Sequence, residues 1–164
     1  MDLWINPSDN FARFRDFGLE DAIIPLRAEG HALPFAEGYF DAVICIDAYH
    51  SFGCAPEYLD AHIVPLVKPG GFIAAAIPGL RQEFTGDIPD ELRPYWQEDI
   101  NFHSAGWWAE LWKQSARAAV RDAFSLRSHK AAWEDWLQCD NPYAQRDAGM
   151  MEKAGWRYFD SIGI

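Results

Sequence analysis

The sequence predicts an α/β protein with a doubly wound, mostly parallel sheet. Two apolar runs, residues 41–46 and 72–77, are almost unbroken and predict strands buried on both faces, as in a parallel sheet. A helical pattern at residues 56–64 lies between them. A strand–helix–strand order forms a right-handed crossover, which places the two strands parallel in one sheet. The 164 residues suit a single domain.

The residues before the first apolar run predict a helix and a short strand. Phenylalanines recur at helical spacing after Ser8, a suitable N-cap, and before Gly18, so residues 8–17 are predicted as a helix. Residues 22–28 predict a short strand, although an internal proline indicates an irregularity. Residues 31–38 are predicted as a loop.

The remainder of the chain predicts a change of pattern after Gly79. Residues 80–103 are loop-rich, with a short helix near residues 89–96. The chain then predicts helices at residues 104–116, 131–137 and 142–155 and strands at residues 120–127 and 156–164, with Ser104 and Asn141 as helix caps and Pro142 at the first position of the last helix.

Composition narrows the classes of function. The formal charge is -11, with 25 acidic and 14 basic residues, so the surface repels polyanions and we expect neither nucleic acid nor an anionic membrane as partner. Cys45, Cys54 and Cys139 form no CxxC pair and no metal-binding pattern, so we expect reduced thiols and no metal site. No apolar run approaches the ~20 residues of a membrane span, and no leader pattern opens the chain. A cytoplasmic location is expected.

Acidic residues lie at the carboxyl ends of predicted strands, where ligands of open α/β sheets bind. Asp2 is the first of them, if it follows a strand, and Glu29 and Asp47 come at two later ends. Carboxylates at neighbouring strand ends suit a nucleoside, because one can accept from ribose hydroxyls and another from an exocyclic amine.

Two ordered motifs resemble class I S-adenosylmethionine-dependent methyltransferases. The stretch AEGHALPF at residues 28–35, followed by GYFDAV at residues 38–43, resembles the family pattern D-A-x-x-L-P-F…F-D-x-V. The stretch PLVKPGG at residues 65–71 resembles the family's L-K-P-G-G turn, at the expected separation. The resemblance covers residues 2–79 and implies a Rossmann-like fold with S-adenosyl-L-methionine as cofactor.

The resemblance also implies cofactor-binding positions. Asp2, with Leu3 beside it, stands where the family's acid holds the ribose. Ala28, Glu29 and Gly30 stand at the adenine, with Glu in place of the usual Asp. Asp47 would orient the cofactor or substrate, although a turn-capping role suits it equally.

Residues after the later strands are candidates for the reaction and the acceptor. Tyr49 and His50 stand where the family lines the methyl-transfer site, with His50 as a general base or a structural histidine. His103, Trp107 and Trp108 are candidates for contact with the substrate. A solvated loop and core packing are the alternatives for these three.

The family's glycine-rich cofactor loop has no counterpart in the sequence. By the family pattern the first strand, the first helix and most of the second strand are missing, so we expect an N-terminally truncated domain with weak or absent cofactor affinity. Within the single domain 1–164, residues 1–79 are predicted as the cofactor-side core, 80–155 as a Trp-rich substrate region and 156–164 as the final strand.

Two functions of different classes follow. The first is S-adenosylmethionine-dependent methyl transfer to a small-molecule acceptor, which requires positioning more than acid–base groups. The alternative is a non-catalytic protein that associates as a homodimer through an exposed sheet edge.

Overall fold

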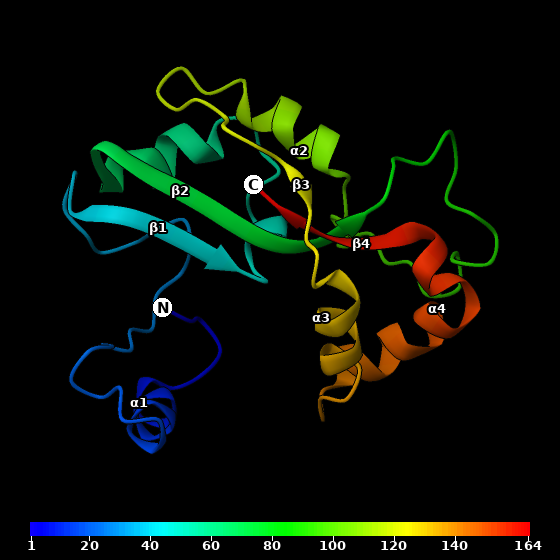
Figure 1. Cartoon of the computed structure of the whole chain (residues 1–164), viewed down its shortest axis with the longest axis horizontal. Coiled ribbons are helices and arrows are strands. Elements are labelled where there is room, and N and C mark those ends of the chain that lie inside the picture. The colour runs from blue at the N-terminus through cyan, green and yellow to red at the C-terminus, as the bar shows by residue number, and fades with distance from the viewer.

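The computed structural model describes the backbone of residues 1–164 and every side chain except those at positions 154 and 155. A four-stranded sheet in the order β1-β2-β4-β3 forms its centre (Figure 1). The strands are β1 (Phe40–Ile46), β2 (Val67–Leu80), β3 (Phe124–Ser125) and β4 (Phe159–Gly163). β1 pairs parallel to β2, and β4 runs antiparallel to both β2 and β3. The predicted α/β class and the parallel crossover are confirmed, and the antiparallel strand makes the sheet mixed.

The predicted glycine-rich turn lies inside β2. Phe40 pairs with Val67, but Ala42 pairs with Phe72, so residues 68–71 bulge out of the ladder. Gly70 has a φ of 82°, a backbone conformation that favours glycine. The strand therefore begins earlier than the apolar run predicted.

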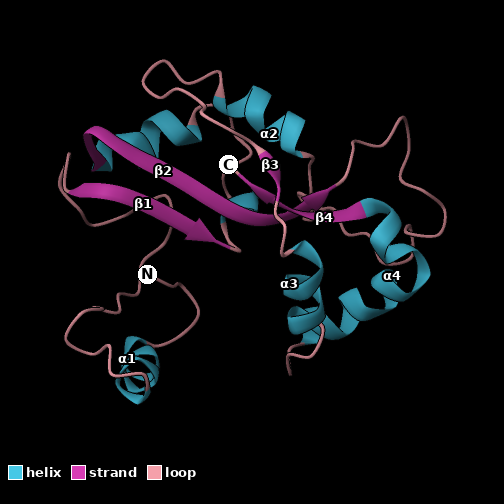
Figure 2. Ribbon diagram, in the orientation of Figure 1, coloured by secondary structure: helices cyan, strands magenta, loops and turns pink.

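The chain has four α-helices, of which the last three lie around the sheet (Figure 2). They are α1 (Pro7–Asp16), α2 (Ala105–Trp112), α3 (His129–Trp136) and α4 (Pro142–Tyr158). The Ser104 side chain caps α2 by accepting from the backbone N–H of Trp107, as predicted. The cap of α1 is Asn6 and not Ser8. Among the described residues, no helix is long and apolar enough to cross a membrane.

Three predicted elements are wrong or much shorter. Of residues 22–28, only Arg27 pairs, in a single parallel bridge with Asp2. Residues 89–96 form turns and no regular helix. The strand predicted at residues 120–127 contracts to Phe124–Ser125. In each case the sequence pattern was short, and tertiary packing outweighed local preference.

The crossover helix predicted at residues 56–64 is irregular. Its residues form a π-helical turn, Leu59–Ile63, followed by a 3-10 turn, Val64–Leu66. Pro65 has no backbone N–H and its ring obstructs the preceding turn, so a regular α-helix cannot continue there.

Two clusters of buried side chains lie on opposite faces of the sheet. Ile77 and Ile162, which are paired across β2 and β4, belong to the first cluster with Trp108 of α2. Leu80 and Phe159, which are paired on the other face, belong to the second cluster with residues of α3 and α4. The sheet is thus covered on both faces at its β2–β4 end.

The β1 end of the second face is not covered. Ile44, Ile46 and Phe72 on this face are 63%, 66% and 59% exposed. The prediction that β1 is buried on both faces is therefore wrong. The helices α3 and α4 pack at the other end of this face, and α1, which has no buried residue, lies apart from the sheet (Figure 1).

Candidate functional site

Asp47 marks the carboxyl end of β1. Its φ is 50°, a left-handed backbone that a non-glycine residue rarely adopts. Its N–H donates to the carbonyl of Ala76 at 2.8 Å, and this hydrogen bond holds the end of β1 against β2. Asp47 is exposed as a residue, but partial desolvation of its carboxyl, together with the charge of Asp147 in α4, raises the pKa of that carboxyl. The structure therefore places one candidate acid at the carboxyl end of β1.

Tyr49 lies in the core. It is 2% exposed and its ring packs edgewise on Trp108 and Trp112. The hydroxyl has no hydrogen-bond partner among the described residues, and burial raises its pKa. A direct catalytic role for Tyr49 remains a prediction, and this position offers it no open path to a ligand.

His50 lies at the same strand end with an unused nitrogen. Its Nδ1 is buried and has no hydrogen-bond partner among the described residues. Burial lowers the His50 pKa to about 4, so the imidazole is neutral near pH 7. The ring packs edgewise on Phe102 with centroids 5.7 Å apart.

His103 lies at the carboxyl end of β2, paired with a carboxylate. Its carbonyl accepts from the Leu80 N–H at 3.1 Å, and a Cβ on Gly79 would approach that carbonyl to 2.5 Å. Its Nδ1 is 3.0 Å from Oε2 of Glu83. The ring stacks on Trp107 with centroids 3.6 Å apart and planes 9° from parallel.

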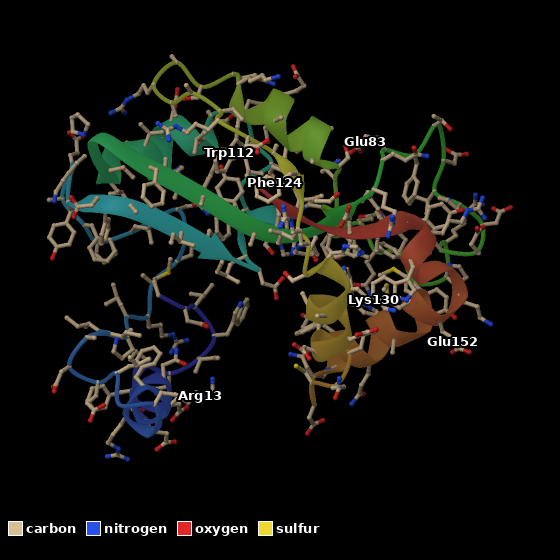
Figure 3. All side chains as sticks on the ribbon, in the orientation of Figure 1. Arg13, Glu83, Trp112, Phe124, Lys130 and Glu152 are labelled. Carbon is tan, nitrogen blue, oxygen red and sulfur yellow. The ribbon has the colours of Figure 1, made fainter. Side chains whose placement is uncertain are left out.

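Glu83 is held by the start of α2, beside which it lies (Figure 3). Its Oε1 accepts from the Ser104 N–H at 2.6 Å. Partial burial alone would raise the pKa of Glu83, but hydrogen bonds from Ser104 and His103 lower it overall. The carboxylate thus fixes the orientation of the His103 ring. Nε2, the second ring nitrogen of His103, is then the atom that could accept a proton.

The two predicted tryptophan contacts differ in placement. Trp107 is partly buried against His103. Trp108 is fully buried in the first cluster, where it packs on Tyr49. Only Trp107 lies on the surface of the site, and contact of either residue with a substrate remains a prediction.

Asp2 and Leu3 lie beside the loop at residue 28. Asp2 donates its N–H to Leu26 at 3.0 Å and accepts from the Ala28 N–H at 3.2 Å. Its Oδ1 accepts from two backbone N–H groups just after it in the chain, at 2.7 and 2.9 Å. The Leu3 carbonyl accepts from Arg27 Nε. The segments that bear the cofactor candidates are thus adjacent.

Glu29 is exposed in this loop, and Gly30 beside it is half-buried. Hydrogen bonds from the His31 side chain and backbone lower the pKa of the Glu29 carboxyl. The Gly30 carbonyl accepts from the Tyr58 hydroxyl at 2.8 Å. Gly30 is thereby joined to the aromatic cluster that contains Tyr49.

Three residues of the site were not found from the sequence. Phe102 contacts His50, Glu83 holds His103, and Tyr58 holds Gly30. Glu83 and Phe102 come from a loop without periodic pattern, so nothing local marked them. Tyr58 lies in the predicted crossover helix, where an aromatic residue ordinarily indicates core packing.

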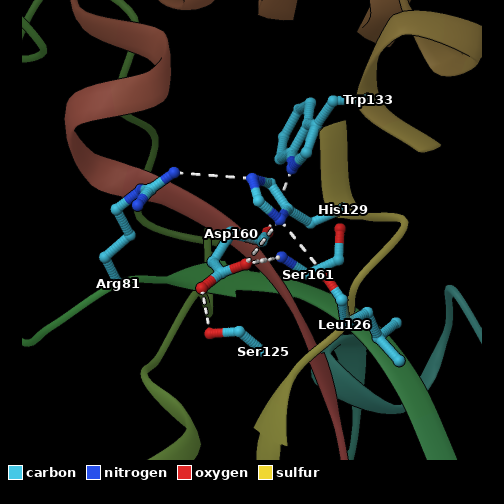
Figure 4. A network of polar contacts seen from close by, with 7 residues as sticks. All are labelled: Arg81, Ser125, Leu126, His129, Trp133, Asp160 and Ser161. Carbon is cyan, nitrogen blue, oxygen red and sulfur yellow. Dashed lines mark hydrogen bonds and ion pairs between the residues drawn. The ribbon is translucent and has the colours of Figure 1, made fainter. Parts of the chain in front are cut away.

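A buried polar network lies outside these strand ends (Figure 4). Asp160 of β4 is 3% exposed and accepts from the Ser125 hydroxyl at 2.5 Å. His129 Nδ1 lies 3.7 Å from Asp160, and its Nε2 lies 3.4 Å from Arg81. The Trp133 indole donates to the Asp160 carbonyl. These contacts join α3 to β3 and β4, a structural role.

The described side chains contain no group of three or more His, Cys, Asp or Glu residues placed to hold a metal ion. One surface depression is lined by residues of 56–61 with Gln114, and another by residues of 122–128. Neither includes the strand-end residues described above.

Comparisons with known proteins agree with the sequence motifs. A family model described as a methyltransferase domain matches residues 5–75. No curated protein sequence matches the chain. The fold resembles geranyl diphosphate C-methyltransferase from Streptomyces coelicolor A3(2), crystallised with Mg²⁺, geranyl diphosphate and S-adenosyl-L-homocysteine, with a TM-score of 0.67 and 14% identity over 96% of this chain and 57% of that one.

Two further structures broaden the comparison. A geranyl diphosphate methyltransferase in complex with SAM has a TM-score of 0.65 and 12% identity, over 99% of this chain and 65% of that one. A [4+2]-cyclase has a TM-score of 0.64 and 16% identity, over 96% and 61%. The chain thus spans 57% to 65% of the length of these three structures. At such identities the likeness shows the fold, and one fold can serve different reactions.

Proposed function

We propose that this chain, which has the fold of the class I S-adenosylmethionine-dependent methyltransferases and matches their domain model over residues 5–75, takes part in methyl transfer to a small-molecule acceptor. The observation that carries the proposal is the arrangement at the strand ends. The loop that contains Glu29 and Gly30 suits a nucleoside and is held by Tyr58. A carboxylate–histidine pair, Glu83 and His103, lies at the carboxyl end of β2.

The residues fit the nucleoside part of S-adenosyl-L-methionine. The bridge between Asp2 and Arg27 keeps two carboxylate-bearing segments adjacent. A Cβ on Gly30 would lie 3.2 Å from the Tyr58 hydroxyl, so the backbone there is closely packed and without a side chain of its own. When bound, this cofactor supplies a methyl group on a positively charged sulfur.

His103 is the candidate proton acceptor. If an acceptor's oxygen, nitrogen or sulfur takes up the methyl group, His103 Nε2 would accept the proton that this atom loses. Glu83 holds Nδ1 at 3.0 Å and stabilises the imidazolium that results. His50 suits this role less well, because burial lowers its pKa to about 4 and its Nδ1 has no partner among the described residues.

Calorimetric titration with S-adenosyl-L-homocysteine tests cofactor binding. We expect saturable binding that is weaker than micromolar, since the sequence has no glycine-rich loop. Glu29→Gln should weaken it roughly fivefold through loss of a charge-assisted hydrogen bond. Glu37→Gln, at an exposed acid nearby, is the matched control. Absence of saturable binding at millimolar concentrations would contradict the proposal for residues 1–164.

Once an acceptor is found, single-turnover kinetics test the base. His103→Gln should lower the rate about 10²–10⁴-fold with cofactor affinity unchanged. Glu83→Gln should lower it by a smaller factor. A larger loss in His50→Gln than in His103→Gln would assign the base to His50.

We also propose a second candidate function, self-association of two copies. It is favoured by the apolar face that carries Ile44, Ile46 and Phe72 beside the outer edge of β1, which is the end strand of the sheet. Such edges pair with further strands unless they are protected. Light scattering across a concentration series should then give a dimer that Ile44→Lys disrupts. A monomer mass at about 100 µM, where a dimer with a micromolar Kd would be mostly formed, would reject this candidate.

A further inference from the structure

Tyr58 connects the loop at Gly30 to the core. Its side chain is 2% exposed, and its hydroxyl donates to the Gly30 carbonyl at 2.8 Å. The ring packs on Tyr49 and Phe52 with centroids 5.7 and 5.2 Å away, and His62 stacks on it at 4.9 Å. These contacts fix the position of the hydroxyl.

The other contacts of the loop with the core lie around Tyr58. The His31 ring lies against Phe52 and His62, with centroids 6.2 and 5.3 Å away, and Leu33 packs against the first cluster. The His31 ring packs edgewise on Tyr58 at 5.0 Å, so the same tyrosine contacts two consecutive residues of the loop. Tyr58 thus links the loop to the first hydrophobic cluster.

Gly30 has no room for a side chain at this contact. A Cβ would lie 3.2 Å from the Tyr58 hydroxyl and 3.4 Å from the Phe52 ring. Its carbonyl accepts from Tyr58, and the N–H groups of His31 and Ala32 donate to Glu29. The N–H groups of Glu29 and Gly30 and the remaining lone pairs of the Glu29 carboxylate are then the groups that would meet a ligand. A donor-plus-acceptor edge of that kind complements a purine that carries an exocyclic amine.

We propose that Tyr58 is a positioning residue for this loop: by holding the Gly30 carbonyl, it sets the orientation in which Glu29 and the neighbouring N–H groups meet an aminopurine nucleoside. The ligand class rests on the proposed function. The role of Tyr58 itself can be measured without any ligand.

Tyr58→Phe keeps the ring and removes the hydroxyl. Hydrogen exchange of the amides at residues 29–32 should become roughly fivefold to tenfold faster, as expected for the loss of one hydrogen bond. Affinity for S-adenosyl-L-homocysteine should fall by a similar factor. Tyr39→Phe, at a tyrosine that is 60% exposed, should change neither quantity. Unchanged exchange in Tyr58→Phe would overturn the inference.

A double-mutant cycle separates positioning from general loosening. Gly30→Ala should weaken nucleoside binding several-fold in the wild type, because the new Cβ meets the hydroxyl. In the Tyr58→Phe background the same change should cost less, because the closest atom is gone. Purely additive effects would also overturn the inference. If the wild type binds no S-adenosyl-L-homocysteine, the proposed function fails, and the exchange experiment still decides the role of Tyr58.

Discussion

Residues 1–48 and residues 49–164 are stabilised in different ways. No described side chain of the first region is buried, and Trp4, Phe17 and Ile24 are each at least 80% exposed. The second region contains both clusters of buried side chains. The cofactor candidates Asp2 and Glu29 lie in the first region, whereas His50 and His103 lie in the second.

The first region is attached mainly through β1, which pairs with β2. The residues before β1 have fewer contacts with the second region, among them the hydrogen bond from Tyr58 to Gly30 and the packing of Leu33 against the first cluster. Because residues 1–39 contain no buried side chain, they should open at a lower free energy than the core. The two sides of the candidate site therefore differ in rigidity.

The largest predicted effect contrasts two tryptophans. Trp108→Ala removes a fully buried side chain and should cost about 3–5 kcal/mol of unfolding free energy. Trp4→Ala, at a side chain that is 88% exposed, should change it by less than about 0.5 kcal/mol. Urea unfolding measures both. Similar losses in the two variants would mean that the first region has a core of its own.

The pH dependence of stability should reveal the buried His50. Its pKa is about 4 in the folded chain, against about 6.5 when unfolded. Between these values the unfolded chain binds the additional proton, so stability falls as the pH is lowered from 6.5 to 4, by on the order of 1–3 kcal/mol.

His50→Gln isolates this contribution. The difference in unfolding free energy between wild type and variant should be constant above pH 7 and should change between pH 6.5 and 4. Carboxylates titrate in both proteins and largely cancel. A difference that stays constant over the whole range would show that His50 is solvated.

A smaller effect, of opposite sign, is expected at Tyr49. Its hydroxyl is buried without a partner among the described residues, so Tyr49→Phe should stabilise the chain by about 1 kcal/mol. Tyr58→Phe is the matched control and should destabilise by a similar amount, because that hydroxyl is bonded. Denaturant midpoints measure both. Destabilisation by Tyr49→Phe would indicate a hydrogen bond that the present geometry lacks.

The smallest effect is predicted on the uncovered face of the sheet. Ile44→Thr keeps the β-branched shape and should alter unfolding free energy by less than about 0.5 kcal/mol, since the side chain is 63% exposed. Ile77→Thr, on the covered face, should cost at least about 2 kcal/mol. Thermal unfolding of the two variants compares the faces. A costly Ile44→Thr would show that this face is covered in solution.

The sequence predicted the elements whose signals are local and repeated. The apolar runs located β1 and most of β2, and Ser104 located the start of α2. It failed where one residue breaks the pattern, as Pro65 does in the crossover helix. Burial of β1 on both faces was also wrong, because the pattern cannot tell how far the neighbouring helices extend.

The candidate site was predictable only in part. The apolar run at residues 41–46 predicted where β1 ends, and therefore that Asp47 and His50 follow its carboxyl end. The pairing of Glu83 with His103 joins residues twenty positions apart across an irregular loop. Such a contact depends on the path of the loop and carries no sequence signal.

The central place of β4 has a consequence for how the chain folds. β4 lies between β2 and β3, yet it follows both in the sequence. Ala76 of β2 pairs with Gly163 of β4, and the segment between them in the sequence contains α2, β3, α3 and α4. Contacts that span so much chain form slowly, since loop closure precedes any gain from pairing. We therefore expect the β1–β2 pair to form before β3 joins the sheet.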